Sequence, residues 1–128
     1  MSNLSLIKTH EAPEPGGHYS QAVVYGGLVY VSGLLPVTVK GEKITGNIED
    51  QFKLVLKNME NILKAAGSSK DKVLKTVIYI SDIKWWDSVN EIYAGFFEEH
   101  KPARAIVPVK TLHHGFSVEL EATAAVIQ

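Results

Sequence analysis

The chain has 128 residues, of which 45% are hydrophobic, and its 13 basic and 14 acidic residues give a formal net charge of -1. This size and balance are those of one ordinary globular domain, not of a disordered, fibrous or membrane chain, and they imply no strongly charged partner. The chain has no cysteine, which excludes disulfides, thiolate metal sites and cysteine catalysis, and no apolar stretch approaches the ~18 residues of a membrane-spanning helix. We therefore expect a single domain over residues 1–128, in the cytoplasm, with no membrane partner.

Two valine- and tyrosine-rich segments near the N-terminus predict a β-hairpin. They run from Gln21 to Tyr25 and from Leu28 to Leu34. Gly26-Gly27 separates them, and two glycines readily take the positive φ values of a tight turn.

A helical period begins after Asn47. Apolar residues then recur at spacings of three and four as far as Ala66. Asn47 suits the N-cap position with Asp50 three residues later, and Gly67 follows the expected end. The intervening lysines alternate with acidic residues, so we expect a solvated helix face that includes Lys53, Lys57 and Lys64.

The second half of the chain predicts a strand, a helix and two more strands. The segment from Val73 to Ile80 is apolar on both alternating faces, which suits a strand covered on both sides. A helix is expected from about Trp85 to Glu99, with Pro102 as its stop. The segments Ala103 to Val109 and Phe116 to Ile127 are expected to be strands. The order of elements predicts an α+β fold.

The predicted sheet has two apolar faces, and two helices can cover only one of them. Large side chains such as Tyr25, Tyr30 and Tyr79 stand in its strands. The economical cover for the second face is another copy of the same sheet. We therefore expect a homo-oligomer.

Arg104 is the only arginine of the chain, and it stands inside an apolar strand. A guanidinium offers a planar fork that matches a carboxylate, which favours anion recognition. The alternative is a structural ion pair with a glutamate of the same sheet. Alternation places Arg104 and Ile106 on one strand face, and it places Glu119 and Glu121 together on one face of the last strand. Arg104 and Glu119 are candidates to meet.

The segment from Pro102 to Ala122 resembles the C-terminal signature of the RidA/YjgF family in residue type and in spacing. It contains Pro102-Ala103-Arg104-Ala105-Ile106-Val107, then Lys110 and Leu112, then Val118-Glu119-Leu120-Glu121-Ala122. Other family segments match upstream, so the similarity covers nearly the whole chain; these are Ala12-Pro13, Tyr19-Ser20-Gln21-Ala22, Val31-Ser32-Gly33, Ala65-Ala66-Gly67-Ser68-Ser69 and Val89-Asn90-Glu91-Ile92-Tyr93.

The resemblance implies the family's chorismate-mutase-like α+β fold, a mixed β-sheet with two helices on one face, assembled as a homotrimer with pockets between subunits. It also implies hydrolysis of 2-iminopropanoate and 2-iminobutanoate to 2-keto acids and ammonia, with neither a metal nor an organic cofactor. By resemblance, Arg104 binds the substrate carboxylate and Glu119 orients the attacking water. The residues that line the pocket by resemblance are Tyr19, Ser32, Gly33, Trp86, Asn90 and Ile106.

These pocket residues also have purely structural interpretations. Tyr19 can pack beside the hairpin, Ser32-Gly33 can form a β-bulge, Trp86 can belong to the helix core, and Asn90 can be a solvated helix residue.

Four positions depart from the usual pattern of the family: His18, Leu34, Ile106 and Leu120. Leu34 stands where glutamine is frequent, and Ile106 stands where many members have cysteine. Both make the expected pocket more apolar, which favours imines with larger aliphatic side chains.

Other chemistries have weak support. His113 and His114 are adjacent, which in extended chain points them to opposite faces, so we expect no metal site. Ser32 lacks the Gly-x-Ser-x-Gly elbow of a serine hydrolase. The alternatives to a deaminase are a ribonuclease or RNA-binding protein, and a non-catalytic binder of small carboxylates. A sequence pI of about 6.5 disfavours nucleic acid as a partner.

Overall fold

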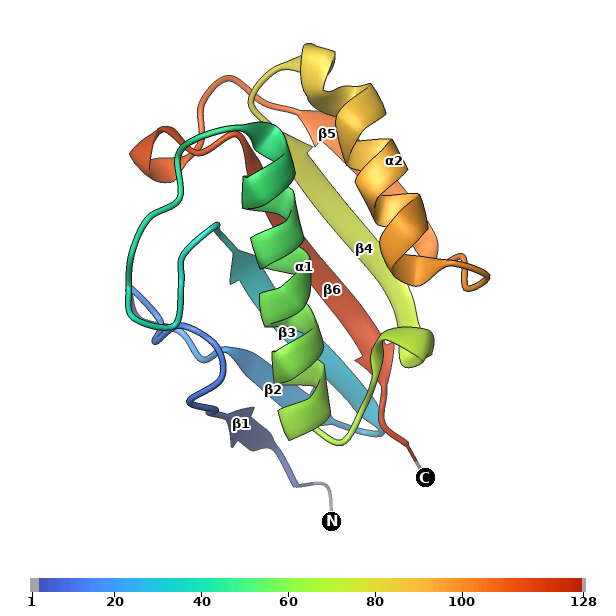
Figure 1. Ribbon diagram of the computed structural model, residues 1–128. Helices are drawn as coiled ribbons and strands as arrows, with labels where there is room; N and C mark the ends of the chain where they lie inside the picture. The colour runs from blue at the N-terminus through green and yellow to red at the C-terminus, as the bar shows by residue number, and fades with distance from the viewer. Residues whose placement is uncertain (1–2, 128) are drawn as a thin grey trace.

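Six strands form one mixed sheet, and two helices cover one of its faces in the computed structural model, which describes residues 3–127 (Figure 1). The strands are β1 (Ser5–Ile7), β2 (Ala22–Tyr25), β3 (Leu28–Leu34), β4 (Val73–Ile80), β5 (Ala103–Pro108) and β6 (Val118–Ala125). The helices are α1 (Ile48–Ala65) and α2 (Trp86–Phe97), and three short 3-10 turns lie at Lys70–Lys72, Ile83–Trp85 and His113–Gly115.

The strand order across the sheet is β1-β2-β3-β6-β4-β5. All neighbours are antiparallel except β4 and β5, which are parallel. This exception follows from connectivity, because α2 links β4 to β5 and a helical crossover returns the chain in the same direction. The mixed α+β sheet with two helices on one face, as predicted, is confirmed.

The predicted hairpin and first helix are also confirmed. Gly26 and Gly27 have φ values of +60° and +81° at the turn between β2 and β3. Asn47 caps α1, because its side-chain oxygen accepts a hydrogen bond from the main-chain nitrogen of Asp50 at 2.8 Å. Gly67, just beyond the helix, has a φ of +78°.

The second helix differs from its prediction at both ends. A 3-10 turn precedes α2, which begins at Trp86. The helix ends at Phe97, because Glu98 takes a left-handed φ of +58°. Pro102 lies four residues further on and is not the stop. Neither helix, within residues 3–127, has the length and apolarity needed to cross a membrane.

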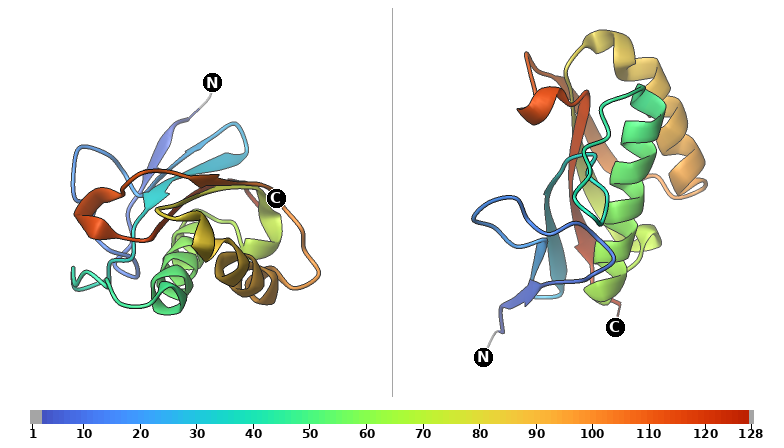
Figure 2. Two further views of the ribbon diagram at one scale, coloured as in Figure 1. Left: turned by 90° about the horizontal axis from the view of Figure 1, so that it is seen from above. Right: turned by 60° about the vertical axis from the view of Figure 1, so that its left-hand side comes forward.

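Both helices lie on the same side of the sheet (Figure 2, left). The core fills the space between them and the sheet. The largest fully buried side chains of this layer are Phe52, Leu56, Met59, Ile62, Leu63, Ile78, Ile80 and Leu120.

Within residues 3–127, no helix covers the other face of the sheet. Register places Val77 between Glu121 and Ala105 on this face, and it places Tyr79 between Glu119 and Val107. Val107 and Tyr30 expose 37% and 46% of their surface. The strand β4 was predicted to be covered on both sides, and within one copy of the chain it is covered on one. We call this surface the open sheet face.

Candidate functional site

The predicted site residues form two groups on opposite faces of the sheet. Arg104 and Ile106 on β5 lie on the helix side, with Trp86 and Asn90 of α2. The second group lines a cavity beside the open sheet face and consists of Tyr19, Ser32, Gly33 and Glu119.

Arg104 is held by one amide and two aromatic rings. Its Nη1 donates a hydrogen bond to Oδ1 of Asn90 at 2.9 Å. Its Cζ lies 4.9 Å from the ring centroid of Tyr93 and 5.6 Å from that of Trp86, distances typical of cation–π contacts. These partners fix the guanidinium on the edge strand.

Helical spacing explains how α2 presents these partners. Trp86, Asn90 and Tyr93 are four and three residues apart, so they lie on one side of the helix. The Tyr93 hydroxyl shares a 2.8 Å hydrogen bond with Thr76 of β4. Burial raises the pKa of Tyr93, while this hydrogen bond and the charge of Arg104 oppose the shift.

The charge of Arg104 has no acidic partner among the residues that the structure describes. Among residues 3–127, no carboxylate oxygen lies within 4.0 Å of its guanidinium. The alternative of a structural ion pair within the sheet is therefore not realised. Asn90 contacts the guanidinium, so it is not merely a solvated helix residue. Trp86 also contacts the guanidinium and is 36% exposed, so it does not belong to the helix core.

Glu119 does not meet Arg104. Thr76 of β4 pairs with Arg104, whereas Tyr79 pairs with Glu119. Residues 76 and 79 of one strand point to opposite faces, so the two charged side chains do as well. The expectation that they meet is wrong for a single copy, although Arg104 and Ile106 do share one face, as Glu119 and Glu121 share the other.

Glu119 projects into a cavity of about 850 Å³. The cavity walls come from β3, from the loop before β2, and from the segments around Lys43 and His113. Burial raises the pKa of the Glu119 carboxyl, and the charge of Glu121 raises it further, while His113 lowers it. The cavity therefore holds a half-buried carboxyl whose pKa is raised above the ordinary value for glutamate.

Gly33 allows the Glu119 carboxylate to approach the main chain of β3. A Cβ atom at position 33 would overlap Oε2 of Glu119. The approach occurs at a β-bulge, because the pairing of β3 with β6 shifts between Val31 and Leu34. Ser32-Gly33 therefore forms the β-bulge of the structural interpretation, and both residues also line the cavity.

Ser32 and Tyr19 belong to the same wall. The Ser32 hydroxyl donates to the Ser20 carbonyl at 2.6 Å, so its proton is already engaged. Tyr19 is 51% exposed, and its hydroxyl accepts a hydrogen bond from the Gly16 main-chain nitrogen at 3.2 Å. Tyr19 is therefore held at the cavity mouth rather than packed into the core.

Gln21 organises the loop that forms this wall, and it was not predicted as a site residue. It is only 4% exposed. Its Oε1 accepts from the Thr9 nitrogen at 2.7 Å, and its Nε2 donates to the carbonyls of Thr9 and Pro13 at 3.1 and 3.0 Å. A glutamine at the start of an apolar strand was the signal available in the sequence.

The two adjacent histidines do not point to opposite faces, because they do not lie in extended chain. His113 and His114 lie in a 3-10 turn with ring centroids 3.7 Å apart, because His114 takes a left-handed φ of +58°. Both line the cavity with Glu119. Within the described part of the chain, no three histidine or acidic side chains converge as metal ligands.

Two family departures lie mainly in the core. Leu34 is 7% exposed and belongs to the hydrophobic core, although it also borders the cavity. Ile106 packs against the core from the helix side, away from Glu119. The two side chains do not line one common pocket within a single copy.

Comparison with known proteins identifies the family. Residues 9–126 match the model described as Endoribonuclease L-PSP. The chain is 42% identical over 120 residues to the RutC family protein PH0854 of Pyrococcus horikoshii, covering 93% of this chain and 95% of that protein. The chain belongs to the RidA/YjgF family.

Two further RidA/YjgF relatives carry information in their names. A human protein named 2-iminobutanoate/2-iminopropanoate deaminase is 40% identical over 120 residues, which is 93% of this chain and 88% of that one. The crystal structure of Escherichia coli TdcF with bound serine is 35% identical, with a TM-score of 0.91, over 96% of this chain and 99% of that one.

Proposed function

We propose that this RidA/YjgF protein is a hydrolytic deaminase of short 2-imino acids, and that its active site is assembled between copies of the chain in a homotrimer. The single observation that carries the proposal is the division of the site. Arg104 has an ordered, unneutralised guanidinium on one side of the sheet, and Glu119 has its cavity on the other. Two copies together can place an Arg104 and a Glu119 beside one substrate, whereas a single copy holds these residues on opposite faces of the sheet.

The open sheet face supports the trimer. It presents Val77, Ala105 and Val107 to solvent in one copy, and burial of such apolar surface favours association. A closed cyclic arrangement uses the same pair of surfaces at each interface. Arg104 stands on β5, the edge strand of the sheet, so a neighbouring copy packed at this edge can bring its Glu119 to the Arg104 of the first copy.

The proposed chemistry needs few groups. Arg104 binds the substrate carboxylate with its planar fork and so sets the position of the imine carbon. Glu119, as a carboxylate, accepts a proton from a water molecule while the water oxygen bonds to C2 of the protonated imine. The same proton then passes to the amine nitrogen. As the C–N bond breaks, Glu119 accepts the remaining proton of the new C2 hydroxyl and passes it to the leaving ammonia, so that ammonium and the 2-keto acid leave. Water is the only co-reactant, so no cofactor is required.

The names of relatives support the substrate class. The human relative is named for 2-iminobutanoate and 2-iminopropanoate. The related TdcF has bound serine, whose carboxylate and α-nitrogen match those of a short 2-imino acid. An anion-binding arginine in this chain is consistent with both.

The direct experiment measures ammonia release by the purified protein from 2-iminobutanoate generated in situ from 2-aminobutanoate by an amino-acid oxidase. We expect release faster than spontaneous hydrolysis without added metal or cofactor, and a Glu119→Gln variant that binds 2-oxobutanoate but turns over slowly. Binding of 2-oxobutanoate without turnover by the wild-type protein would instead make this chain a non-catalytic binder of carboxylates.

The description of the matching family model favours ribonuclease as the second candidate. Phosphate-tracking surfaces gather basic charge, whereas this chain has a net charge of -1 and its lysines are interleaved with acids. We expect no tight binding of single-stranded RNA at about 150 mM salt. RNA cleavage that survives Arg104→Ala and Glu119→Gln would reverse the order of the two candidates.

A further inference from the structure

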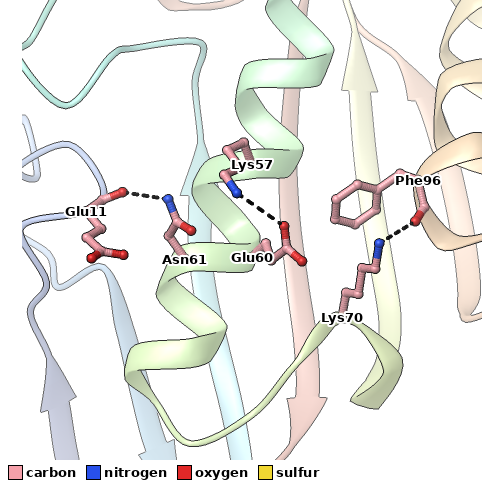
Figure 3. Close-up of polar contacts among 6 residues, drawn as sticks. All are labelled: Glu11, Lys57, Glu60, Asn61, Lys70 and Phe96. Carbon is pink, nitrogen blue, oxygen red and sulfur yellow. Dashed lines mark hydrogen bonds and ion pairs between the residues drawn. The ribbon is translucent and has the colours of Figure 1, made fainter.

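A second hollow of about 460 Å³ lies between α1 and α2, apart from the proposed active site. Figure 3 shows several of its side chains. We call it the interhelix groove; its lining residues are Lys53, Leu56, Lys57, Glu60, Lys70, Ile92, Gly95 and Phe96. It shares no residue with the Arg104 group or the Glu119 cavity.

The floor of the interhelix groove is apolar. Leu56 of α1 is fully buried beneath it, and Ile92 and Phe96 of α2 are half-buried beside it. Apolar side chains at a surface hollow favour a partner that brings apolar side chains of its own.

The rim of the groove is basic. It carries Lys53, Lys57 and Lys70 against the single acid Glu60, whose Oε1 lies 3.7 Å from Nζ of Lys57 (Figure 3). The lining therefore has a formal charge of +2 in a chain whose net charge is -1. This local excess of positive charge favours an acidic partner.

Lys70, in the 3-10 turn Lys70–Lys72 that follows α1, joins this turn to α2 at the groove. Its Nζ donates to the Phe96 carbonyl at 3.1 Å and lies 4.8 Å from the centroid of the Phe96 ring (Figure 3). Phe96 is thus held in place at the groove, so part of the apolar floor is ordered before any partner arrives.

Gly95 keeps the groove open. A Cβ atom at this position would have no heavy atom within 4 Å, so packing does not require glycine there. Glycine inside a helix is less favourable than alanine. Glycine at position 95 therefore leaves open space above the apolar floor.

We propose that the interhelix groove docks an acidic amphipathic helix of a partner protein. The α1 side of the groove extends from Lys53 to Glu60, about 10 Å at 1.5 Å per residue. This length matches the apolar anchors of two helical turns, spaced i, i+4 and i+7. Glutamates and aspartates that flank those anchors would face the lysine rim.

The experiment uses a fluorescent peptide with leucines at i, i+3, i+4 and i+7 and glutamates at most other positions, titrated with the full-length protein and followed by anisotropy. We expect saturable binding that weakens as salt rises. Gly95→Leu places an apolar side chain in the groove, at a position where its Cβ atom meets no heavy atom within 4 Å. The Lys53→Glu/Lys57→Glu double variant reverses the rim charge. Each should weaken binding by about tenfold or more.

Lys64→Glu is the matched control, because Lys64 is an exposed lysine of the same helix that does not line the groove. It should leave peptide binding unchanged, and circular dichroism should show that all variants are folded at the temperature of the binding assay. Equal affinity for a peptide with lysines in place of the glutamates, or wild-type affinity of Gly95→Leu, would overturn the proposal. Absence of saturable binding at about 1 mM peptide would do the same. None of these readouts depends on deaminase activity, so the proposed function can fail independently.

Discussion

The side chains of Arg104 and Glu119 lie on opposite faces of the same sheet, because their partners on β4 are three residues apart. A single copy of the chain therefore cannot apply both groups to one small substrate. If the proposed deaminase is correct, each active site combines the arginine of one copy with the glutamate of its neighbour.

This division predicts complementation between two inactive variants. Homotrimers of Arg104→Ala and of Glu119→Gln should each be nearly inactive. Mixed trimers, formed by joint denaturation and refolding at a 1:1 ratio, contain interfaces in which both residues are intact. Random assembly makes about a quarter of the interfaces intact, so we expect up to about a quarter of wild-type activity. Recovery no greater than the sum of the separately refolded variants would contradict a shared site.

Arg104→Lys separates charge from geometry. Loss of a hydrogen-bonded charge partner costs about 3 kcal/mol or more, so Arg104→Ala should lower kcat/KM about a hundredfold or more. Lysine keeps the charge but not the planar fork that positions the imine carbon, so it should recover only a small part of this loss. Steady-state kinetics and 2-oxobutanoate affinity check the prediction. Near-full activity of Arg104→Lys would assign only a charge to this position.

Gly33→Ala should remove activity without unfolding the protein. The added Cβ atom would occupy the place of Glu119 Oε2, and the flexible glutamate side chain can swing away at little cost to the fold. We expect a large fall in kcat with a nearly unchanged melting temperature. Gly16→Ala is the matched control, since Gly16 lines the same cavity but a Cβ there meets nothing within 4 Å. Equal activity of the two variants would show that the position of the Glu119 carboxylate against β3 is unimportant.

Substitution on the open sheet face tests the trimer. Light scattering of the wild-type protein should report about 42 kDa, three chains of 14.1 kDa each. Val77→Lys places a charge among Ala105, Glu121 and the other residues of this face, and we expect it to shift the protein to smaller species at micromolar concentration. Val39→Lys, at an exposed valine outside the sheet, should leave the mass unchanged. An intact Val77→Lys trimer would place the interface elsewhere.

Local signals in the sequence predicted most elements but not their arrangement. Strong periodicity and a capping asparagine located α1 almost to the residue, and a segment that is apolar on both alternating faces located β4. The strand β1 has only three residues and exists through its pairing with β2, which no local pattern reveals. The end of α2 depends on the left-handed Glu98, a residue type that does not favour that conformation.

The candidate site shows the same limit. Alternation correctly placed Arg104 with Ile106 and Glu119 with Glu121, but the relation between the two strands depends on register through β4. Register is a tertiary property, so the sequence allowed Arg104 and Glu119 to meet where the fold separates them. The close approach of the His113 and His114 rings was missed because it depends on a single left-handed residue.

Ionisation of Glu119 should affect the folding stability of the protein. Within one copy, burial and then Glu121 raise its pKa above the ordinary value of 4.5. A raised folded-state pKa means that the folded protein binds the proton more tightly than the unfolded chain. The stability that this proton provides is complete below pH 4.5 and is lost as pH rises through the folded-state pKa. Ionised Glu119 therefore opposes folding at pH 7.

A neutral isostere removes this penalty, so Glu119→Gln should raise the melting temperature at pH 7, with a gain that shrinks as pH falls through the folded-state pKa and is gone below pH 4.5. In the proposed trimer, Arg104 of a neighbouring copy stabilises the ionised carboxylate. The gain should then be smaller in the wild-type background than in Arg104→Ala, and calorimetry of the four proteins in this cycle measures the difference. Equal gains in both backgrounds would mean that the two residues do not interact across the interface. A gain that grows toward acid pH would mean that the carboxyl pKa is lowered, not raised.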